Sequence, residues 1–203
     1  MTPEVRVILL GPPGAGKGTQ GHVICNTLSI SHIATGDILR QAVANQTSLG
    51  KKAKEFMDAG ELVPDELVID LMRERLSEDD CGGGFLLDGF PRTVEQAKSL
   101  TEMLTELDRS ITHVIDLKVS EEVLLERILK RAQEGAARSD DTGEIAQNRL
   151  KVYWEQTSPV SAYYKDLGTY RGVDGLGAVE EVSQRVMMEL DQPIIHEKSA
   201  GQC

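Results

Sequence analysis

The chain has 203 residues, of which 40% are hydrophobic and 27% are charged, a composition typical of one globular domain with a proper core. Its formal net charge is −11. Such an acidic balance argues against a nucleic acid as partner, because duplex binding depends on a basic surface that displaces counterions.

Apolar runs and helical spacing alternate along the chain. Short apolar runs predict strands at residues 5–10, 32–34, 85–87, 112–119 and 169–173, and longer segments with helical spacing include 93–107, 121–132 and 144–166. Strands that alternate with helices favour an α/β fold with a parallel sheet covered on both faces. In such folds ligands bind beyond the carboxyl ends of the strands.

Two stretches interrupt this alternation. Between Gly36 and Glu78 the spacing predicts three helices without a strand, with Gly60 as a helix stop and Pro64 as a start. We expect this part to be a helical insertion over the edge of the sheet. Residues 133–141 are small and polar, and we expect them to form a mobile lid.

The segment Gly11-Pro-Pro-Gly-Ala-Gly-Lys17-Gly18-Thr19 follows the first apolar run directly. A strand, a glycine-rich loop and a lysine are typical of a P-loop, in which backbone N–H groups and a helix N-terminus cradle phosphates. The hydroxyl that usually follows the lysine is displaced by one place, to Thr19. A glycine-rich turn without a ligand is the alternative, which the preceding strand and Lys17 disfavour.

Six arginines follow the predicted strands or flank the predicted lid: Arg40, Arg92, Arg127, Arg131, Arg138 and Arg149. A guanidinium group can grip phosphate oxygens through two parallel N–H bonds. One arginine suffices for hydrolysis of a nucleoside triphosphate, so several indicate a second substrate that already carries phosphate. Such an acceptor needs no catalytic base, because its oxygen is already an anion at neutral pH.

Two further polar residues have competing interpretations. Asp88 ends the third apolar run, where a carboxylate can hold the Mg²⁺ shell directly or through water, or can simply start a turn. Gln96 lies three residues after Thr93, which is capping-box spacing. The residues alone leave equal weight on a capping role and on a binding role for Gln96.

Together these motifs make the chain similar to the adenylate kinase family, of the type with a short lid. The phosphate loop with its displaced threonine, Thr35-Gly-Asp37 with Arg40, the segment 57–65 and Phe85-Leu-Leu-Asp-Gly-Phe-Pro-Arg92 carry the resemblance, which spans residues 5–190. It implies reversible phosphoryl transfer from Mg²⁺-ATP to AMP, which gives two ADP. The expected partners are therefore ATP, AMP and ADP, with Mg²⁺ as cofactor.

The resemblance also implies roles for individual residues. ATP would contact Gly14, Ala15, Gly16, Lys17, Gly18, Thr19, Arg127, Arg131 and Gly177. AMP would contact Thr35, Arg40, Glu61, Leu62, Val63, Gly89, Phe90, Pro91, Arg92, Gln96, Arg138 and Arg149. The catalytic group would be Lys17, Arg92, Arg131, Arg138 and Arg149. Asp88 would hold Mg²⁺ through water, and no zinc site is expected in the lid. Gln96 would read the adenine of AMP through its amide.

By the same resemblance, residues 1–203 form a single domain. Its core would comprise residues 1–34, 65–130 and 142–190, with an AMP-binding segment at 35–64, a short lid at 131–141 and a tail at 191–203. A UMP/CMP kinase is the nearest alternative, and Gln96 favours AMP over it. A non-catalytic nucleotide switch or sensor is a further alternative. For it, Asp174-Gly-Leu-Gly177 matches a short GTPase element, but no guanine-reading N-K-x-D motif is found.

The cysteines and the apolar runs bear on location. Cys25, Cys81 and Cys203 are far apart and lack the spacing of a disulfide framework or a zinc site. No apolar stretch approaches the ~18 residues that cross a bilayer, and the first expected strand begins too early to leave room for a signal peptide. We expect a cytoplasmic monomer with no membrane partner.

Overall fold

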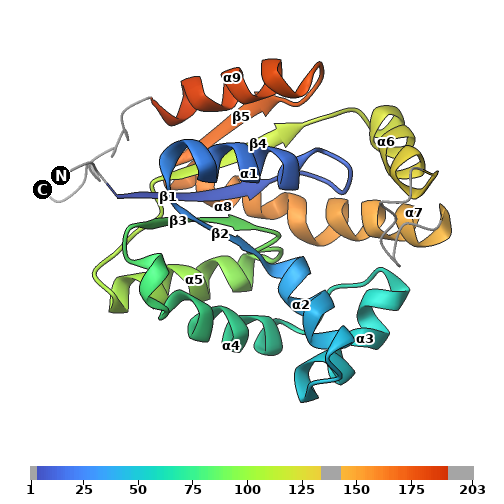
Figure 1. Cartoon of the computed structure of the whole chain (residues 1–203), viewed down its shortest axis with the longest axis horizontal. Helices are drawn as coiled ribbons and strands as arrows, with labels where there is room; N and C mark the ends of the chain where they lie inside the picture. Colours follow the sequence, from blue (N-terminus) through green and yellow to red (C-terminus); the bar gives the residue numbers. More distant parts are fainter. Residues whose placement is uncertain (1–3, 134–142, 192–203) are drawn as a thin grey trace, which may run out of the picture.

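A computed structural model describes residues 4–133 and 143–191 of the chain, apart from the side chains of residues 132 and 133. Five parallel strands form one sheet in the order β2-β3-β1-β4-β5 (Figure 1). Their bounds are Val5–Leu10 for β1, Ser31–Ala34 for β2, Gly84–Asp88 for β3, His113–Lys118 for β4 and Tyr170–Asp174 for β5. The predicted α/β class with a parallel sheet is confirmed.

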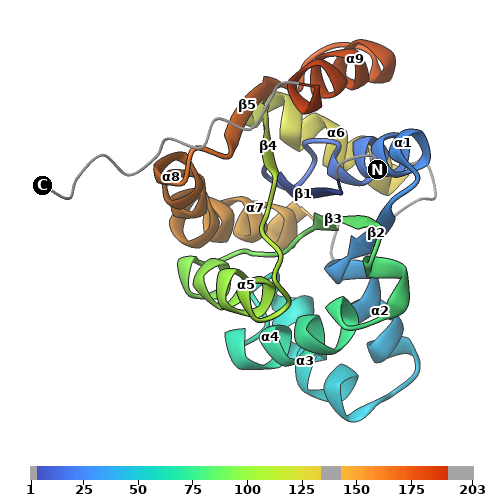
Figure 2. The same cartoon turned by 90° about the vertical axis from the view of Figure 1, so that its left-hand side faces the viewer.

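Helices cover both faces of this sheet (Figure 2). Those described are α1 (Lys17–Leu28), α2 (Thr35–Ala44), α3 (Ser48–Ala59), α4 (Asp65–Leu76), α5 (Val94–Glu106), α6 (Glu121–Gln133), α7 (Gly143–Val152), α8 (Ser158–Asp166) and α9 (Val179–Leu190), with a short 3₁₀ turn at Asp79–Cys81. None of the helices in this part of the chain is long and apolar enough to cross a membrane.

The residues of β1 divide between two hydrophobic clusters, because successive side chains of a strand point to opposite faces. Val7 and Leu9 pack with apolar residues of α1, α6 and α9, whereas Ile8 and Leu10 pack with residues of α4, α5 and α8. All four are at most 4% exposed. A strand buried on both faces reads as a continuous apolar run, as residues 7–10 do.

Three strands end at the same level of the sheet. Asp88, the last residue of β3, is in register with Leu9 of β1 on one side and with Ala34 of β2 on the other. The P-loop follows β1, α2 follows β2, and the Gly89–Arg92 turn follows β3. The topology therefore brings three separate predicted motifs to one edge of the sheet.

The segment between β2 and β3 contains α2, α3 and α4 with no strand, as the spacing predicts. Gly60 ends α3 in the left-handed conformation with φ of 72°, and Pro64 directly precedes α4. Helices α2 and α3 extend away from the sheet edge (Figure 1). The insertion thus forms an arm beside the carboxyl ends of the strands.

The helical segment predicted over residues 144–166 is confirmed, because residues 143–166 are helical throughout, but this segment is not one regular α-helix. The chain forms α7, then a π-helical turn at Tyr153–Thr157, and then α8. Pro159 lies in the first turn of α8, where it lacks an N–H and its ring would crowd the carbonyl four residues earlier. The wider turn accommodates this proline, and the Ser158 N–H donates to the carbonyl of Tyr153, five residues back.

Candidate active site

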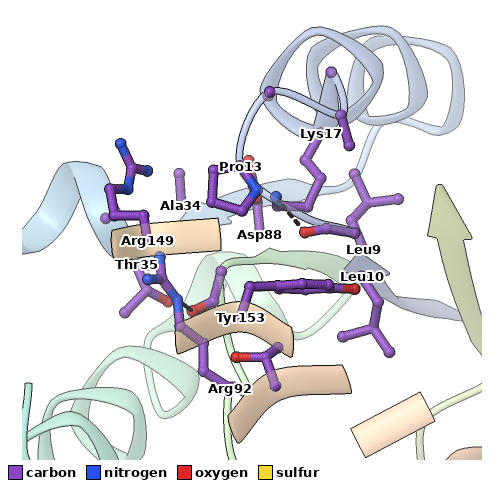
Figure 3. Close-up of a pocket in the computed structure, with 18 of the residues that line it drawn as sticks. Leu9, Leu10, Pro13, Lys17, Ala34, Thr35, Asp88, Arg92, Arg149 and Tyr153 are labelled. Atoms are coloured by element: carbon purple, nitrogen blue, oxygen red, sulfur yellow. Dashed lines mark hydrogen bonds between the residues drawn. The ribbon is translucent and has the colours of Figure 1, made fainter. Parts of the chain in front are cut away.

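A cavity of about 640 Å³ lies at the carboxyl ends of the strands (Figure 3). Its walls come from the P-loop, the start of α2, the loop between α3 and α4, the turn after β3, and helices α6 and α7. This volume is within the range of pockets that bind small molecules and cofactors. The cavity is the natural candidate for the nucleotide site.

The P-loop surrounds one end of this cavity. Gly14 and Gly16 have φ of 86° and 95°, a conformation that residues with a Cβ rarely adopt. No side chain caps the N-terminus of α1, so the N–H groups of its first turn are not taken by a capping residue. Lys17 Nζ donates to the carbonyls of Gly11 at 2.7 Å and Pro12 at 3.1 Å. The loop thus combines N–H donors, a helix dipole and an ammonium group.

Asp88 faces the P-loop from the end of β3. A Cβ at Gly18 would lie 3.7 Å from Asp88 Oδ2, so glycine keeps the space beside this carboxylate open. His32 Nε2 lies 3.9 Å from the same oxygen. Burial lowers the pKa of the His32 imidazole, and the charge of Asp88 opposes that effect only in part. Asp88 and Thr19 both line the cavity.

These residues suit Mg²⁺. Carboxylate and hydroxyl oxygens are the hard ligands that Mg²⁺ takes, and it is commonly held by one or two carboxylates, water and substrate phosphates. In residues 4–133 and 143–191, no group of three His, Cys, Asp or Glu side chains is placed to hold a metal on its own. Asp88 therefore fits an ion that arrives with a nucleotide better than a closed protein site.

The other end of the cavity holds residues of the expected AMP site. Thr35 is 2% exposed, and its hydroxyl donates to Met72 Sδ at 3.5 Å. Arg40 pairs with Asp37 at the start of α2. The backbone segment Glu61, Leu62 and Val63 lines the cavity beside them. The structure thus brings the predicted residues of α2 and of the α3–α4 loop to one wall.

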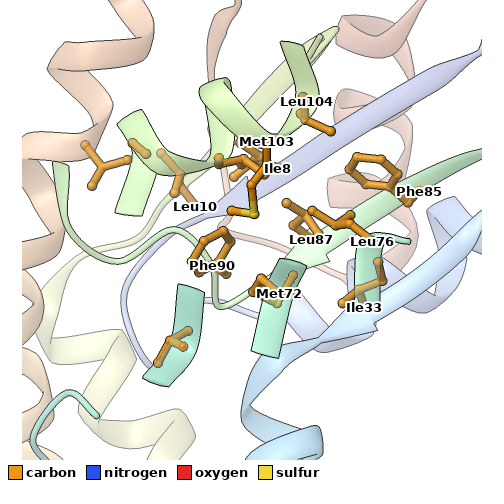
Figure 4. Packing of buried hydrophobic residues seen from close by; sticks show 14 of the residues in the cluster. Ile8, Leu10, Ile33, Met72, Leu76, Phe85, Leu87, Phe90, Met103 and Leu104 are labelled. Atoms are coloured by element: carbon orange, nitrogen blue, oxygen red, sulfur yellow. The ribbon is translucent and has the colours of Figure 1, made fainter. Parts of the chain in front are cut away.

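The turn after β3 supplies Arg92. Its Nε donates to the carbonyl of Gly89 at 2.9 Å, and Gly89, Pro91 and Arg92 all line the cavity. Phe90 differs from its neighbours, because its side chain is fully buried among Met72, Leu87 and other core residues (Figure 4). Of the predicted AMP residues in this turn, Phe90 therefore has only its backbone to offer.

The contacts of Gln96 bear on the two roles that the sequence left open, capping of α5 and binding of a ligand. Its backbone N–H donates to Thr93 Oγ1 at 3.1 Å, so Thr93 does cap α5. The side chain reaches back to the Arg92 N–H, at 2.7 Å from Oε1, and not to Thr93 as a capping box requires. Gln96 is 2% exposed and lines the cavity. Its contact with a base stays a prediction.

The remaining predicted residues that the structure describes belong to α6, to α7 and to the loop after β5. Arg127 and Arg131 of α6 and Arg149 of α7 line the cavity, as does Gly177 after β5. Arg127 also donates to the carbonyl of Gly175 at 3.0 Å, which joins α6 to the loop after β5. Arg138 lies outside the described residues, as does most of the expected lid.

The cavity includes residues that the sequence did not single out. Tyr153 and Thr157 reach it from the π-helical turn, and His22 and His32 lie near the P-loop. Helical periodicity could not place Tyr153 and Thr157, because the π turn shifts the face on which they lie. The sequence signal that could have found them is Pro159 inside a helical pattern.

Comparison with known proteins agrees with this geometry. The sequence model of the family described as "Adenylate kinase" matches residues 9–169. The "Adenylate kinase" of Leptospira biflexa serovar Patoc is 50% identical over 186 residues, covering 91% of this chain and 99% of that protein. That of Thermobifida fusca is 48% identical, covering 92% and 98%, and that of Geotalea daltonii is 46% identical, covering 90% and 98%. The chain belongs to the adenylate kinase family.

Proposed function

We propose that this cavity binds Mg²⁺-ATP and AMP together and transfers the terminal phosphoryl group between them, reversibly, to give two ADP. One observation carries the proposal. A single cavity is lined at one end by the P-loop and at the other by Thr35, Arg40 and Gln96, with arginines of three separate elements around it. Two phosphorylated substrates can face each other in such a site.

The chemistry needs no proton acceptor from the protein. A phosphate oxygen of AMP attacks the terminal phosphorus of ATP, a new P–O bond forms, and the bond to the oxygen that bridges to the β-phosphorus breaks. Catalysis then depends on alignment and on neutralising charge as it moves. Lys17, Arg92, Arg131 and Arg149 would do this, joined by Arg138. Mg²⁺ would add charge neutralisation between the phosphates, with Asp88 and Thr19 holding its water shell.

Residue roles follow the two ends of the cavity. Gly14–Thr19, Arg127, Arg131 and the backbone at Gly177 would hold ATP, and Thr35, Arg40, Glu61–Val63, Gly89–Arg92, Gln96 and Arg149 would hold AMP. In the proposed division of the chain, residues 35–64 form the AMP-binding segment and residues 131–141 the short lid. Closure of both would exclude water, which competes with AMP for the phosphoryl group.

The same site supports proposals on state and location. The described residues of this chain line both the P-loop end and the Thr35 end of the cavity, and we propose that the enzyme works as a monomer. Cys25 and Cys81 are buried free thiols, which are usual in a reducing compartment and support a cytoplasmic location. Light scattering at micromolar concentration tests whether the enzyme is a monomer, and the mass of a dimer would contradict the proposal.

A coupled assay of ADP formation tests the function. We expect turnover with ATP as donor and AMP as acceptor, and much lower kcat/KM with GMP, CMP or UMP. Faster turnover with UMP or CMP would instead support a pyrimidine nucleotide kinase, the nearest alternative. Binding of ATP without AMP-dependent formation of ADP would support a non-catalytic sensor and overturn the proposal.

A further inference from the structure

Asp65, the first residue of α4, holds the amide of Gln96 although it does not itself line the cavity. Gln96 Nε2 donates to Asp65 Oδ1 at 2.8 Å, and Thr93 Oγ1 donates to Asp65 Oδ2 at 2.7 Å. Each carboxylate oxygen thus has one partner at the start of α5. Neither the P-loop motif nor the arginine pattern points to Asp65, and it is absent from the predicted site residues.

These contacts fix which way the amide of Gln96 is turned. A carboxylate only accepts hydrogen bonds, and a backbone N–H only donates. Asp65 Oδ1 therefore requires the NH₂ group on its side, and the Arg92 N–H, 2.7 Å from Oε1, requires the carbonyl on the other side. Turning the amide over would set two donors against each other at Arg92 and two acceptors against each other at Asp65.

The fixed amide leaves one N–H of Nε2 and one lone pair of Oε1 for a ligand in the cavity that Gln96 lines. The Watson–Crick edge of adenine offers an amino donor at C6 and an acceptor at N1, which match this pair. Hypoxanthine and guanine offer a carbonyl at C6 and an N–H at N1, which need the amide turned over. A site built for one pattern rejects the reverse pattern, because buried polar groups are left unpaired.

We propose that Asp65 is a positioning residue that sets the orientation of the Gln96 amide and thereby makes the acceptor site select 6-amino over 6-oxo purine nucleotides. The inference rests on the proposed function, because it assumes that Gln96 faces the acceptor base. Asp65 directly follows the loop that contains Glu61, Leu62 and Val63, so the same carboxylate also ties that loop to α5. The base-reading amide and the AMP-binding segment therefore share one anchor.

Inosine monophosphate is the probe, since it differs from AMP at the purine edge and keeps the same ring size. We compare kcat/KM for AMP and inosine monophosphate, at saturating ATP, in the wild type and in Asp65→Ala. We expect the preference for AMP to fall about tenfold in Asp65→Ala, the worth of one lost hydrogen bond to an ion. The KM for ATP should stay the same, because Asp65 is remote from the P-loop end.

Two variants separate the effect of Asp65 on the orientation of the Gln96 amide from the effect of its negative charge. Asp65→Asn keeps a carbonyl acceptor for Gln96 Nε2, so it should stay within about threefold of the wild-type preference. Glu66→Ala removes a neighbouring exposed acidic residue from the same first turn of α4 and should leave the preference unchanged. If Asp65→Asn loses as much preference as Asp65→Ala, charge rather than acceptor geometry matters, and the proposal is wrong.

A double-mutant cycle makes the test independent of folding effects. In a Gln96→Leu background, Asp65→Ala should change the preference no further, because the two residues act as a unit. Asp65→Ser replaces Asp65→Ala if the latter fails to fold. Loss of thermal stability with an unchanged AMP preference would show a purely structural role and overturn the proposal. Absence of AMP-dependent turnover in the wild type would instead contradict the proposed function.

Discussion

Arg92 is held in the turn after β3 by hydrogen bonds of both its side chain and its backbone. Its Nε donates to the Gly89 carbonyl at 2.9 Å, which positions the guanidinium, and its backbone N–H donates to Gln96 Oε1. We expect Arg92→Ala to lower kcat about 10³-fold without unfolding the protein, because an arginine that neutralises a transferring phosphoryl group has an effect of that order. The coupled assay measures the loss, and circular dichroism checks the fold.

Arg73→Ala is the matched control for this change. Arg73 lies on α4, pairs with Glu106 at 2.9 Å and is half-exposed, away from the cavity. Exposed pairs of this kind contribute little, so activity should stay close to the wild type. Near-normal activity of Arg92→Ala would remove Arg92 from the catalytic group.

Cys25 and Cys81 should resist alkylation in the folded protein. Burial raises the pKa of each thiol from 9.0 to about 11, and at Cys25 the charge of Asp88 adds to the effect. The thiolate, which is the reacting form, is then about 100-fold scarcer at pH 8 than for an ordinary cysteine. Treatment with iodoacetamide followed by peptide mass spectrometry should find both sites modified only in denaturant. Rapid modification of native Cys81 would contradict its buried placement.

The same shifts predict how stability depends on pH. A thiol with a higher pKa in the folded chain binds its proton more tightly there, so its contribution is complete below pH 9 and is lost as the pH rises toward 11. The free energy of unfolding in urea should therefore fall between pH 9 and pH 11. Cys25→Ala should fall less over this interval. An equal fall in the variant and the wild type would show that Cys25 does not contribute.

At the scale of residues, the sequence predicted which residues line the site but not which hydrogen bonds hold them in place. Lys17 and Arg92 stand in motifs that follow strands, Arg149 follows the predicted lid, and the fold brings all three to one cavity. The partner of Gln96 could not be found in this way. Asp65 is 31 positions away, and its contact depends on how α4 packs on α5. Tertiary contacts between two helices leave no short-range pattern in the sequence.

The joint between α2 and α3 is the tightest place in the helical insertion. Gly50, buried in the first turn of α3, has no room for a side chain, since a Cβ there would lie 2.0 Å from the carbonyl oxygen of Ala42. We expect Gly50→Ala to lower the free energy of unfolding by about 1–3 kcal/mol through overpacking. Because α2 carries Thr35 and Arg40, the KM for AMP should rise while the KM for ATP stays unchanged.

Gly83→Ala provides the matched comparison. A Cβ at Gly83 meets no atom within 4 Å, so the same substitution should leave stability within about 0.5 kcal/mol of the wild type. Urea unfolding measures both variants, and initial rates give the KM values. Equal stability of the two variants would show that α2 and α3 move apart without cost.

At the scale of elements, the sequence predicted where strands and helices lie but not where the helical geometry changes within one segment. The strands were found to within one residue at each end, and the apolar runs of β1, β3 and β4 are largely buried. The segment 144–166 keeps helical spacing throughout, yet Pro159 imposes a π turn inside it. Tyr153 and Thr157 reach the cavity from that turn, so a change in helical geometry that the sequence did not reveal left both residues out of the predicted site.

The whole molecule carries a charge of −11, whereas its cavity is basic. Among the described lining residues, Lys17 and five arginines, Arg40, Arg92, Arg127, Arg131 and Arg149, face three acidic residues, Asp37, Glu61 and Asp88. Local charge therefore opposes the overall field, and binding of two polyanions depends on this concentrated cluster. The sequence indicated this cluster because several arginines together follow strands or flank the lid. One arginine alone would not have distinguished a binding site from an ordinary surface residue.

Both substrates should stabilise the whole domain, because their proposed sites share one cavity and one sheet. At about 100 times its Kd, a ligand adds roughly 2.7 kcal/mol, which corresponds to a rise in Tm of about 5–10 °C for a chain of this size. Arg92→Ala should lose the rise caused by AMP and keep the rise caused by ATP. Lys17→Ala should do the opposite, since Lys17 Nζ lies over the P-loop.

Differential scanning fluorimetry with each nucleotide alone measures these four shifts without any turnover. The crossed pattern requires two separate subsites whose occupancy stabilises the same cooperative unit, which a single nucleotide site cannot produce. If AMP and ATP lose their effect together in both variants, the two ends of the cavity bind one ligand rather than two. The P-loop and the Arg92 end would then form a single nucleotide site, and transfer between two bound nucleotides would be excluded.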